Sequence, residues 1–217
     1  MRIKFDEQLR QLNTEMIRMG NMIEKAIQSS IEAFFDQDVE TAQQIIKDDE
    51  FVDQEQKTIE NICFQLLIQQ QPVARDLRAI TAAMKMVTDM ERIGDHAADI
   101  SELTIMMADG SDIVKGGHIR KMTSEVVYML LQAIDAYVER DMEKAREVIE
   151  HDEIVDNLFV EVKADLIEIM QQNKDYAEYA ADLLMVNKYL ERIGDHATNI
   201  AEWVIFSIEG SPEQRDY

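Results

Sequence analysis

The sequence predicts an all-α protein made of two tandem, pseudo-twofold-related three-helix bundles, with six long helices. The first observation behind this prediction is the scarcity of turn residues. Only 7 glycines and 2 prolines occur among 217 residues, whereas a sheet-rich fold needs frequent turns that use both residue types. The other two observations are apolar residues that recur at helical spacing and an internal repeat that divides the chain.

A doubled motif reveals the repeat. Twelve residues from Glu91 to Glu102 recur from Glu191 to Glu202, 100 residues later, with nine positions identical. In the same way, Asp49-Glu-Phe-Val-Asp53 recurs as Asp152-Glu-Ile-Val-Asp156, 103 residues later. We therefore expect two homologous halves. The expected domains are a first bundle at 1–112, a second bundle at 113–210 and a polar tail at 211–217.

Chain breakers separate three helices in the first half. Apolar residues recur at helical spacing over 5–35, which predicts the first helix. Asp38 is the expected N-cap of a second helix that ends near residue 71. Pro72 then fits the first turn of a third helix, which runs to about residue 109, because its missing N–H costs nothing there.

The second half is expected to repeat this order. Gly110, Gly116 and Gly117 mark the boundary between the halves. Three helices of similar length joined by short loops make an up-down-up bundle that buries one apolar stripe from each. The fourteen methionines are expected to fill the two cores. The helices of the second half are predicted at 118–138, 141–172 and 175–208.

Acidic pairs in the first half lie at matching heights of the predicted hairpin. Asp53 and Glu91 have residue 72 as their midpoint, and so do Asp49 and Asp95. Residues equidistant from the turn of an antiparallel helix pair lie level with each other, and acids four apart share one helix face. Four carboxylates at one level repel each other, and a multivalent cation would turn that repulsion into binding.

Asp152, Asp156, Glu191 and Asp195 repeat this arrangement around the turn of the second half. Helical phase places the acidic stripes beside the core rather than within it. Any metal ion held there would lie near the surface. The alternative is an ordinary solvated acidic face, in a protein that has 44 acidic residues. The sequence leaves this alternative open, because bundle handedness decides whether the pairs converge or point apart.

Two glycines and two histidines accompany the acidic stripes. Gly94 and Gly194 each interrupt a helix at a cost of about 1 kcal/mol relative to alanine. Close helix packing beside the acidic cluster would explain them. His96 and His196 follow the stripe residues and could bind metal or carry protons, or they could be partly exposed, hydrogen-bonded histidines.

The charge balance narrows the classes of function. With 44 acidic and 22 basic residues the net charge is −22, which argues against nucleic-acid binding and against docking to an anionic membrane. Metal ions and basic protein surfaces remain as natural partners. The single cysteine, Cys63, cannot form an intrachain disulfide and fits a cytoplasmic setting. We expect neither a signal peptide nor a membrane-spanning segment, because no apolar run of the needed length occurs.

Three motifs together resemble the PhoU family of phosphate-signalling proteins. They are Gln71-Pro-Val-Ala-Arg-Asp-Leu-Arg78, the doubled Glu-Arg-Ile-Gly-Asp-His and the two Asp-x-x-x-Asp segments, and the resemblance covers essentially the whole chain. It implies a fold of two three-helix bundles and a regulatory role without catalysis. Members link the Pst phosphate ABC transporter to a PhoR-type sensor histidine kinase, act as negative regulators of the phosphate response, and in some cases restrain phosphate uptake.

The resemblance also implies cofactors and partners. Family members bind multinuclear metal clusters, with iron or zinc most expected and magnesium or manganese as further options. The implied partners are the sensor kinase and the ATPase subunit of the transporter, for a cytoplasmic homodimer held near the inner face of the cell membrane by protein contacts. The implied ligands in this sequence are Asp49, Asp53, Glu91, Asp95, Asp152, Asp156, Glu191 and Asp195.

The halves also depart from perfect repetition. Asp99 corresponds to Asn199, so the two clusters are expected to differ in ligand number or occupancy. The segment from Gln71 to Arg78 has no clear copy in the second half. Any partner-binding role of that segment would therefore belong to the first half.

Two enzyme classes remain as alternatives. A carboxylate-bridged di-metal oxidase uses helical bundles but needs Glu-x-x-His spacing, whereas His96 follows Glu91 by five residues. A prenyl-diphosphate enzyme could use the acidic run from Asp48 to Asp53 for magnesium diphosphate, but it needs one large apolar cavity. No nucleophile–base constellation, glycine-rich phosphate loop or Cys/His zinc spacing is found in the sequence.

Overall fold

The computed structural model of the protein describes residues 2–70, 72–107, 117–172 and 174–210, and these form six α-helices and one short 3₁₀ turn. The predicted all-α class is confirmed. The predicted boundary between 112 and 113 and the polar tail at 211–217 lie outside the described residues. The helices are α1 (Arg2–Asp36), α2 (Val39–Gln70), α3 (Ala74–Met106), α4 (Gly117–Glu139), α5 (Met142–Gln172) and α6 (Ala177–Glu209), with the 3₁₀ turn η1 at Lys174–Tyr176.

Aspartate caps begin the second helix of each half. Asp38 accepts a hydrogen bond from the backbone N–H three residues later, at 3.0 Å, as its predicted N-cap role requires. Asp141 accepts the equivalent bond at 3.1 Å in the second half. The residue before each cap adopts a left-handed backbone conformation, with φ of 54° at Gln37 and 58° at Arg140. The turn before the second helix therefore has the same conformation in both halves, and equivalent residues there are 103 positions apart.

The third helix of each half begins later than predicted. Pro72 lies before α3 instead of in its first turn, because Val73 is the N-cap and has an extended backbone. A proline fixes only φ, so it suits an extended connection as well as a helix start. In the second half, η1 precedes α6, which begins at Ala177.

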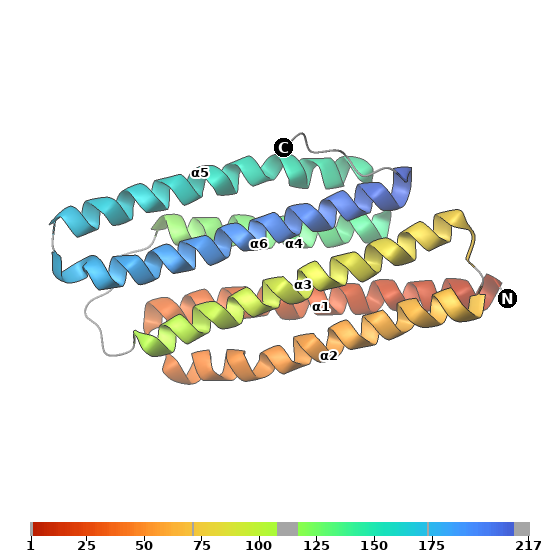
Figure 1. Ribbon diagram of the computed structural model, residues 1–217, viewed down its shortest axis with the longest axis horizontal. Helices are drawn as coiled ribbons and strands as arrows, with labels where there is room; N and C mark the ends of the chain where they lie inside the picture. The colour runs from red at the N-terminus through yellow and green to blue at the C-terminus, as the bar shows by residue number, and fades with distance from the viewer. Residues whose placement is uncertain (1, 71, 108–116, 173, 211–217) are drawn as a thin grey trace.

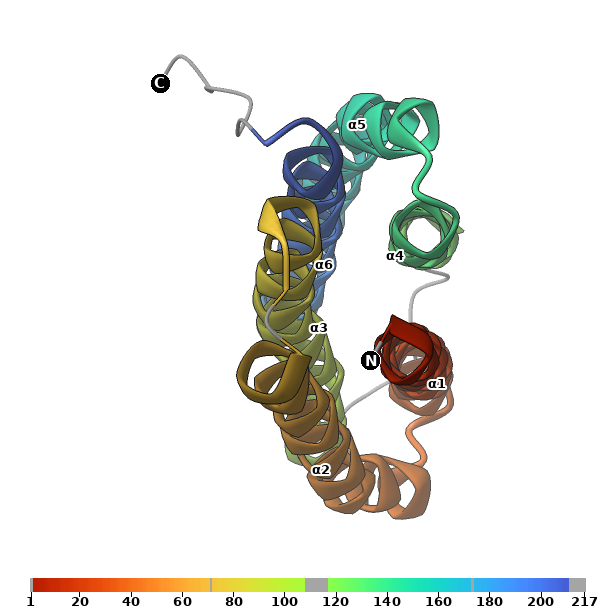
Figure 2. The same cartoon turned by 90° about the vertical axis from the view of Figure 1, so that its right-hand side faces the viewer.

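The two halves are joined along their third helices (Figures 1 and 2). Helices α3 and α6 lie side by side in the middle of the molecule, and α2 and α5 flank them to form one curved layer of four helices. Helices α1 and α4 lie next to each other on one face of this layer. The sequence predicted two bundles but not this contact between them.

The apolar stripes of all six helices form one continuous core. Methionines supply much of it, as expected, although Met106 and Met185 are exposed. Cys63 is a buried free thiol, and burial raises its pKa to about 12. In the described ranges, no helix is long and apolar enough to cross a bilayer. The fully buried methionines are Met16, Met19, Met86, Met90, Met122 and Met129.

Candidate metal centre

The structure brings the predicted carboxylates of the first half together. Helix α2 carries Asp49 and Asp53, and helix α3 carries Glu91 and Asp95. Burial first, and then the negative charges of Asp95, Asp53 and Glu91, raise the pKa of the Asp49 carboxyl to about 6. The pKa values of Glu91 and Asp95 are raised for the same two reasons. We call these four residues the first carboxylate cluster.

Gly94 allows the first cluster to form. A Cβ atom at this position would lie 3.2 Å from Asp49 Oδ1 and 3.1 Å from Val52 Cγ1. Any side chain here would therefore force the Asp49 and Val52 side chains to shift by a few tenths of an ångström. The expected close packing beside the acidic residues is confirmed, because the Asp49 carboxylate rests directly on the backbone of α3.

The second half repeats the contact with slightly more room. A Cβ atom at Gly194 would lie 3.2 Å from Val155 Cγ1 and 3.4 Å from Asp152 Oδ1. Asp152 of α5 therefore lies beside Gly194 of α6, as Asp49 of α2 lies beside Gly94 of α3. The second carboxylate cluster consists of Asp152, Asp156, Glu191 and Asp195.

The carboxylates of the second cluster also repel each other. Burial raises the pKa of the Asp195 carboxyl, and the charge of Glu191 raises it further. Asp156 adds to this effect, while the nearby Lys188 ammonium opposes it. Lys188 forms an ion pair with Glu191 at the edge of the cluster.

A different cation borders the first cluster. Arg92 forms ion pairs with Asp95 at 3.3 Å and with Glu91 at 3.6 Å. Its side chain is 58% exposed, so water screens these ion pairs and each stabilises the fold by less than about 1 kcal/mol. One exposed arginine therefore leaves much of the carboxylate repulsion in place.

One further carboxylate belongs beside the first cluster. Asp99 contributes to the raised pKa of Asp49 and of Asp95. It lies four residues beyond Asp95 on the same helix face, and this spacing is the signal by which it can be found in the sequence. The corresponding residue in the second half is Asn199, so the two clusters differ in charge.

The chemistry of the donor set fits metal ions. Crowded, partly buried carboxylates with raised pKa values are poor partners for each other and good ligands for hard cations. In the described part of the chain, no group of three or more Asp, Glu, His or Cys side chains is arranged to hold a single ion. Side-chain rotations would therefore be needed to close either cluster around a metal.

His96 and His196 lie at the contact between the two halves. Their ring centroids are 5.7 Å apart. His96 Nδ1 lies 3.1 Å from Asp99 Oδ2, and His196 Nδ1 lies 2.8 Å from Asp89 Oδ1 on the other half. Both histidines thus match the expectation of partly exposed, hydrogen-bonded side chains. The sequence did not predict Asp89 as a partner, because 107 residues separate it from His196.

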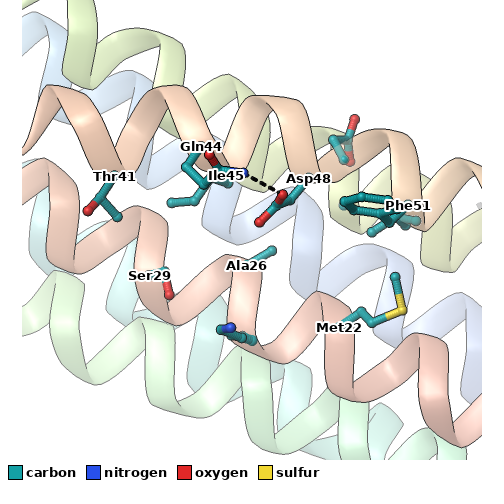
Figure 3. Close-up of a pocket in the computed structure, with 12 residues that line it drawn as sticks. Met22, Ala26, Ser29, Thr41, Gln44, Ile45, Asp48 and Phe51 are labelled. Atoms are coloured by element: carbon teal, nitrogen blue, oxygen red, sulfur yellow. Dashed lines mark hydrogen bonds between the residues drawn. The ribbon is translucent and has the colours of Figure 1, made fainter.

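A pocket of about 380 Å³ opens beside the first cluster, between α1 and α2 (Figure 3). Asp49 and Gly94 reach it from the cluster side. Met22 and Lys25 line it from α1, and Phe51 lines it from α2. This pocket could not be predicted from the sequence, because its polar and apolar residues follow no motif.

Comparison with known proteins assigns the family. The PhoU domain matches this chain twice, over residues 16–104 and 119–204. The phosphate-specific transport system accessory protein PhoU homolog of Clostridium acetobutylicum is 44% identical over 210 residues, covering 95% of this chain and 94% of the relative. The homolog of the same name from Pseudomonas aeruginosa is 31% identical and covers 96% of this chain and 86% of the relative.

Solved structures agree in fold. The crystal structure of PhoU from Pseudomonas aeruginosa matches with a TM-score of 0.88 at 31% identity, covering 95% of this chain and all of the other. The regulatory protein PhoU from Streptococcus pneumoniae matches with a TM-score of 0.87 at 24% identity, a likeness of fold, over 97% of this chain. Two PhoU domains and relatives that span nearly the whole length show that this chain belongs to the PhoU family.

Proposed function

We propose that this chain is a metal-binding regulator of phosphate homeostasis, which restrains phosphate uptake and the phosphate-starvation response. The observation that carries the proposal is the pair of carboxylate clusters, one in each half, each beside a helix glycine at which an added Cβ atom would lie 3.2–3.4 Å from an aspartate oxygen. The names of the relatives support the phosphate-transport part, because they are phosphate-specific transport system accessory proteins.

The chain's own residues would hold the metal between paired helices. Asp49 and Asp53 approach from α2 while Glu91 and Asp95 approach from α3, so a bound cluster would tie these two helices together. Asp152, Asp156, Glu191 and Asp195 would do the same for α5 and α6. Bound metal ions supply the positive charge that cancels carboxylate repulsion. We propose iron or zinc, with magnesium or manganese as options that an all-carboxylate donor set also accommodates.

The proposed partners are a PhoR-type sensor histidine kinase and the ATPase subunit of the Pst transporter. A protein with a net charge of −22 is attracted to basic surfaces on such partners, and the attraction weakens with salt. The protein would act in the cytoplasm as a homodimer, close to the membrane through these contacts. In this role it carries a signal between transporter and kinase without catalysing a reaction.

The enzyme alternatives gain no support from the relatives, which are named as accessory proteins. The histidine near the first cluster is hydrogen-bonded to Asp99 instead of forming a Glu-x-x-His pair with a cluster carboxylate. The pocket beside this cluster has charged as well as apolar walls, unlike the large apolar cavity that a prenyl chain requires.

Metal content and gene regulation test the proposal together. Protein purified without an affinity tag should contain stoichiometric metal by elemental analysis, and Asp49→Asn/Asp95→Asn should lose part of it. The same variant should leave a phosphate-starvation reporter active in high phosphate. The matched control, Glu32→Gln/Asp36→Asn, removes two exposed acids of α1 and should change neither result. Metal-free parent protein that still represses the reporter would contradict the metal-dependent role.

A further inference from the structure

The pocket between α1 and α2 has an equivalent location in the second half. The caps Asp38 and Asp141 are 103 residues apart and begin α2 and α5 in the same way. Because the helices on both sides of these turns are uninterrupted, every pocket residue on α1 and α2 has a counterpart 103 positions later. Lys25 corresponds to Tyr128, and Asp48 corresponds to His151.

Side chains of the second half contact one another at this location, where Tyr128 is 44% exposed. The rings of Tyr128 and His151 pack with centroids 4.8 Å apart. His151 Nε2 lies 2.8 Å from an oxygen of Glu125, the counterpart of Met22. A tyrosine, a histidine and a glutamate from α4 and α5 thus form one connected group.

The first half lacks such a group. With Lys25 and Asp48 in place of the two rings, a space of about 380 Å³ remains open (Figure 3). Asp48 accepts a hydrogen bond from Gln44 at 2.7 Å, on its own helix. Phe51 at the pocket is 63% exposed. The same backbone therefore carries a tyrosine–histidine contact in one half and a pocket in the other.

We propose that the first-half pocket receives a tyrosine side chain from a partner protein, in the place that Tyr128 occupies in the second half. Thioether and aromatic surfaces at Met22 and Phe51 favour a ring. The Lys25 ammonium can lie over the face of that ring, and the Asp48 carboxylate can accept the phenol hydrogen.

A protein partner fits the pocket better than a free small molecule. Sites for small molecules enclose most of their ligand, whereas this pocket lies between two outer helices and borders an exposed phenylalanine. Exposed aromatic surface next to a pocket is typical of protein interfaces, where tyrosines supply much of the binding energy. Asp48 and Asp49 add negative charge that favours a basic residue beside the incoming tyrosine.

Direct titration tests the pocket without reference to metal or to phosphate regulation. The probe is N-acetyl-tyrosinamide, added to full-length protein with carbon-13 in the methionine methyl groups. We expect a saturable shift of the Met22 resonance, with a dissociation constant of about 1–10 mM. N-acetyl-phenylalaninamide, which lacks the hydroxyl, should bind several-fold more weakly. No saturable shift at Met22 would overturn the proposal.

Exchanging residues between the halves sharpens the test. Lys25→Tyr/Asp48→His should close the first-half pocket and reduce probe binding at least tenfold, and Lys25→Tyr alone should do so in part. Tyr128→Lys/His151→Asp should open a second site, detected at Met129, the counterpart of the pocket residue Ala26. Unchanged binding in a folded closing variant would contradict the assignment.

Partner recovery then separates a protein occupant from a free ligand. This arm alone rests on the proposed function, because it uses the kinase and the transporter ATPase as bait. The closing variant should keep its metal content but recover at least tenfold less of one bait than the parent does. Equal recovery would overturn the docking role. Metal loss in the parent, by contrast, would count against the proposed function and not against the pocket.

Discussion

The two halves of the molecule share a backbone and differ in the side chains around each carboxylate cluster. Both halves place an aspartate oxygen beside a helix glycine, where an added Cβ atom would lie 3.2 Å from that oxygen in the first half and 3.4 Å in the second. Yet Asp99 adds a fifth carboxylate to the first half only, and Asn199 in the same place donates a hydrogen bond to Asp89 instead. The repeat therefore preserves the packing that positions a site more strictly than it preserves the charge within it.

The difference extends to the surface beside each cluster. Tyr128, His151 and Glu125 contact one another in the second half, while the equivalent location in the first half is a pocket. The first half thus combines the additional carboxylate with the pocket. We expect partner binding and metal exchange to be concentrated there.

Charge reversal should separate the two clusters most clearly. Glu91→Lys/Asp95→Lys should abolish metal binding in the first half, because lysine ammonium groups would replace two ligands. About half of the bound metal should remain, since distant sites act independently. Elemental analysis measures the effect, with Glu191→Lys/Asp195→Lys as the matched variant in the second half. Complete loss of metal from either variant would show that the halves bind as one unit.

Filling the helix glycines should weaken the fold in both halves. Gly94→Val places its Cβ within 3.1–3.2 Å of Val52 and Asp49 and should destabilise the protein by about 2–3 kcal/mol. Gly194→Val should cost slightly less. Urea unfolding in the presence of a chelator measures both values. The control is Gly117→Ala, where a Cβ meets nothing within 4 Å, and a cost at Gly117 equal to that at Gly94 would refute the packing argument.

Removing the fifth carboxylate should make the first half resemble the second. Asp99→Asn keeps an oxygen that can pair with His96, which now lies 3.1 Å from Asp99, but it deletes one negative charge. Metal affinity of the first half should fall about tenfold, as with other groups just outside a ligand set. Competition with a metal-binding dye measures this change. Unaltered metal affinity would mean that Asp99 positions His96 and has no effect on metal binding.

The pH dependence of stability should show the smallest effect. Because the pKa of Asp49 is about 6 in the folded protein against 3.8 for a free side chain, the native state keeps this proton to higher pH than the unfolded chain does. Metal-free protein should therefore lose stability as the pH rises from about 4 to about 6. Asp49→Asn should flatten this part of the curve, measured by thermal unfolding in chelator, while Asp36→Asn should leave it unchanged.

Much of the fold could be predicted from the sequence because its causes are local. Helical spacing of apolar residues and the cap at Asp38 specify where helices run. Asp49 and Asp95 lie at the same height along the helix pair because they are equally far from the turn at residue 72. Pro72 misled the prediction of the third helix, since an extended proline and a helical one have the same φ.

The contact between the halves could not be predicted in this way. Helix α3 packs on α6 through the detailed shape of two buried surfaces, and His196 finds Asp89 across 107 residues. The pocket likewise depends on side chains that differ between the halves, such as Lys25 in the place of Tyr128. Such features follow from three-dimensional packing between distant segments, for which neither periodicity nor spacing carries a signal.

Anomalous X-ray diffraction from crystals of the untagged protein tests the central claim most directly. Data collected across the absorption edge of the metal found by elemental analysis should show one peak beside Asp49 and Asp95 and another beside Asp195 and Glu191. A peak only between His96 and His196, or none near either carboxylate cluster, would contradict the account.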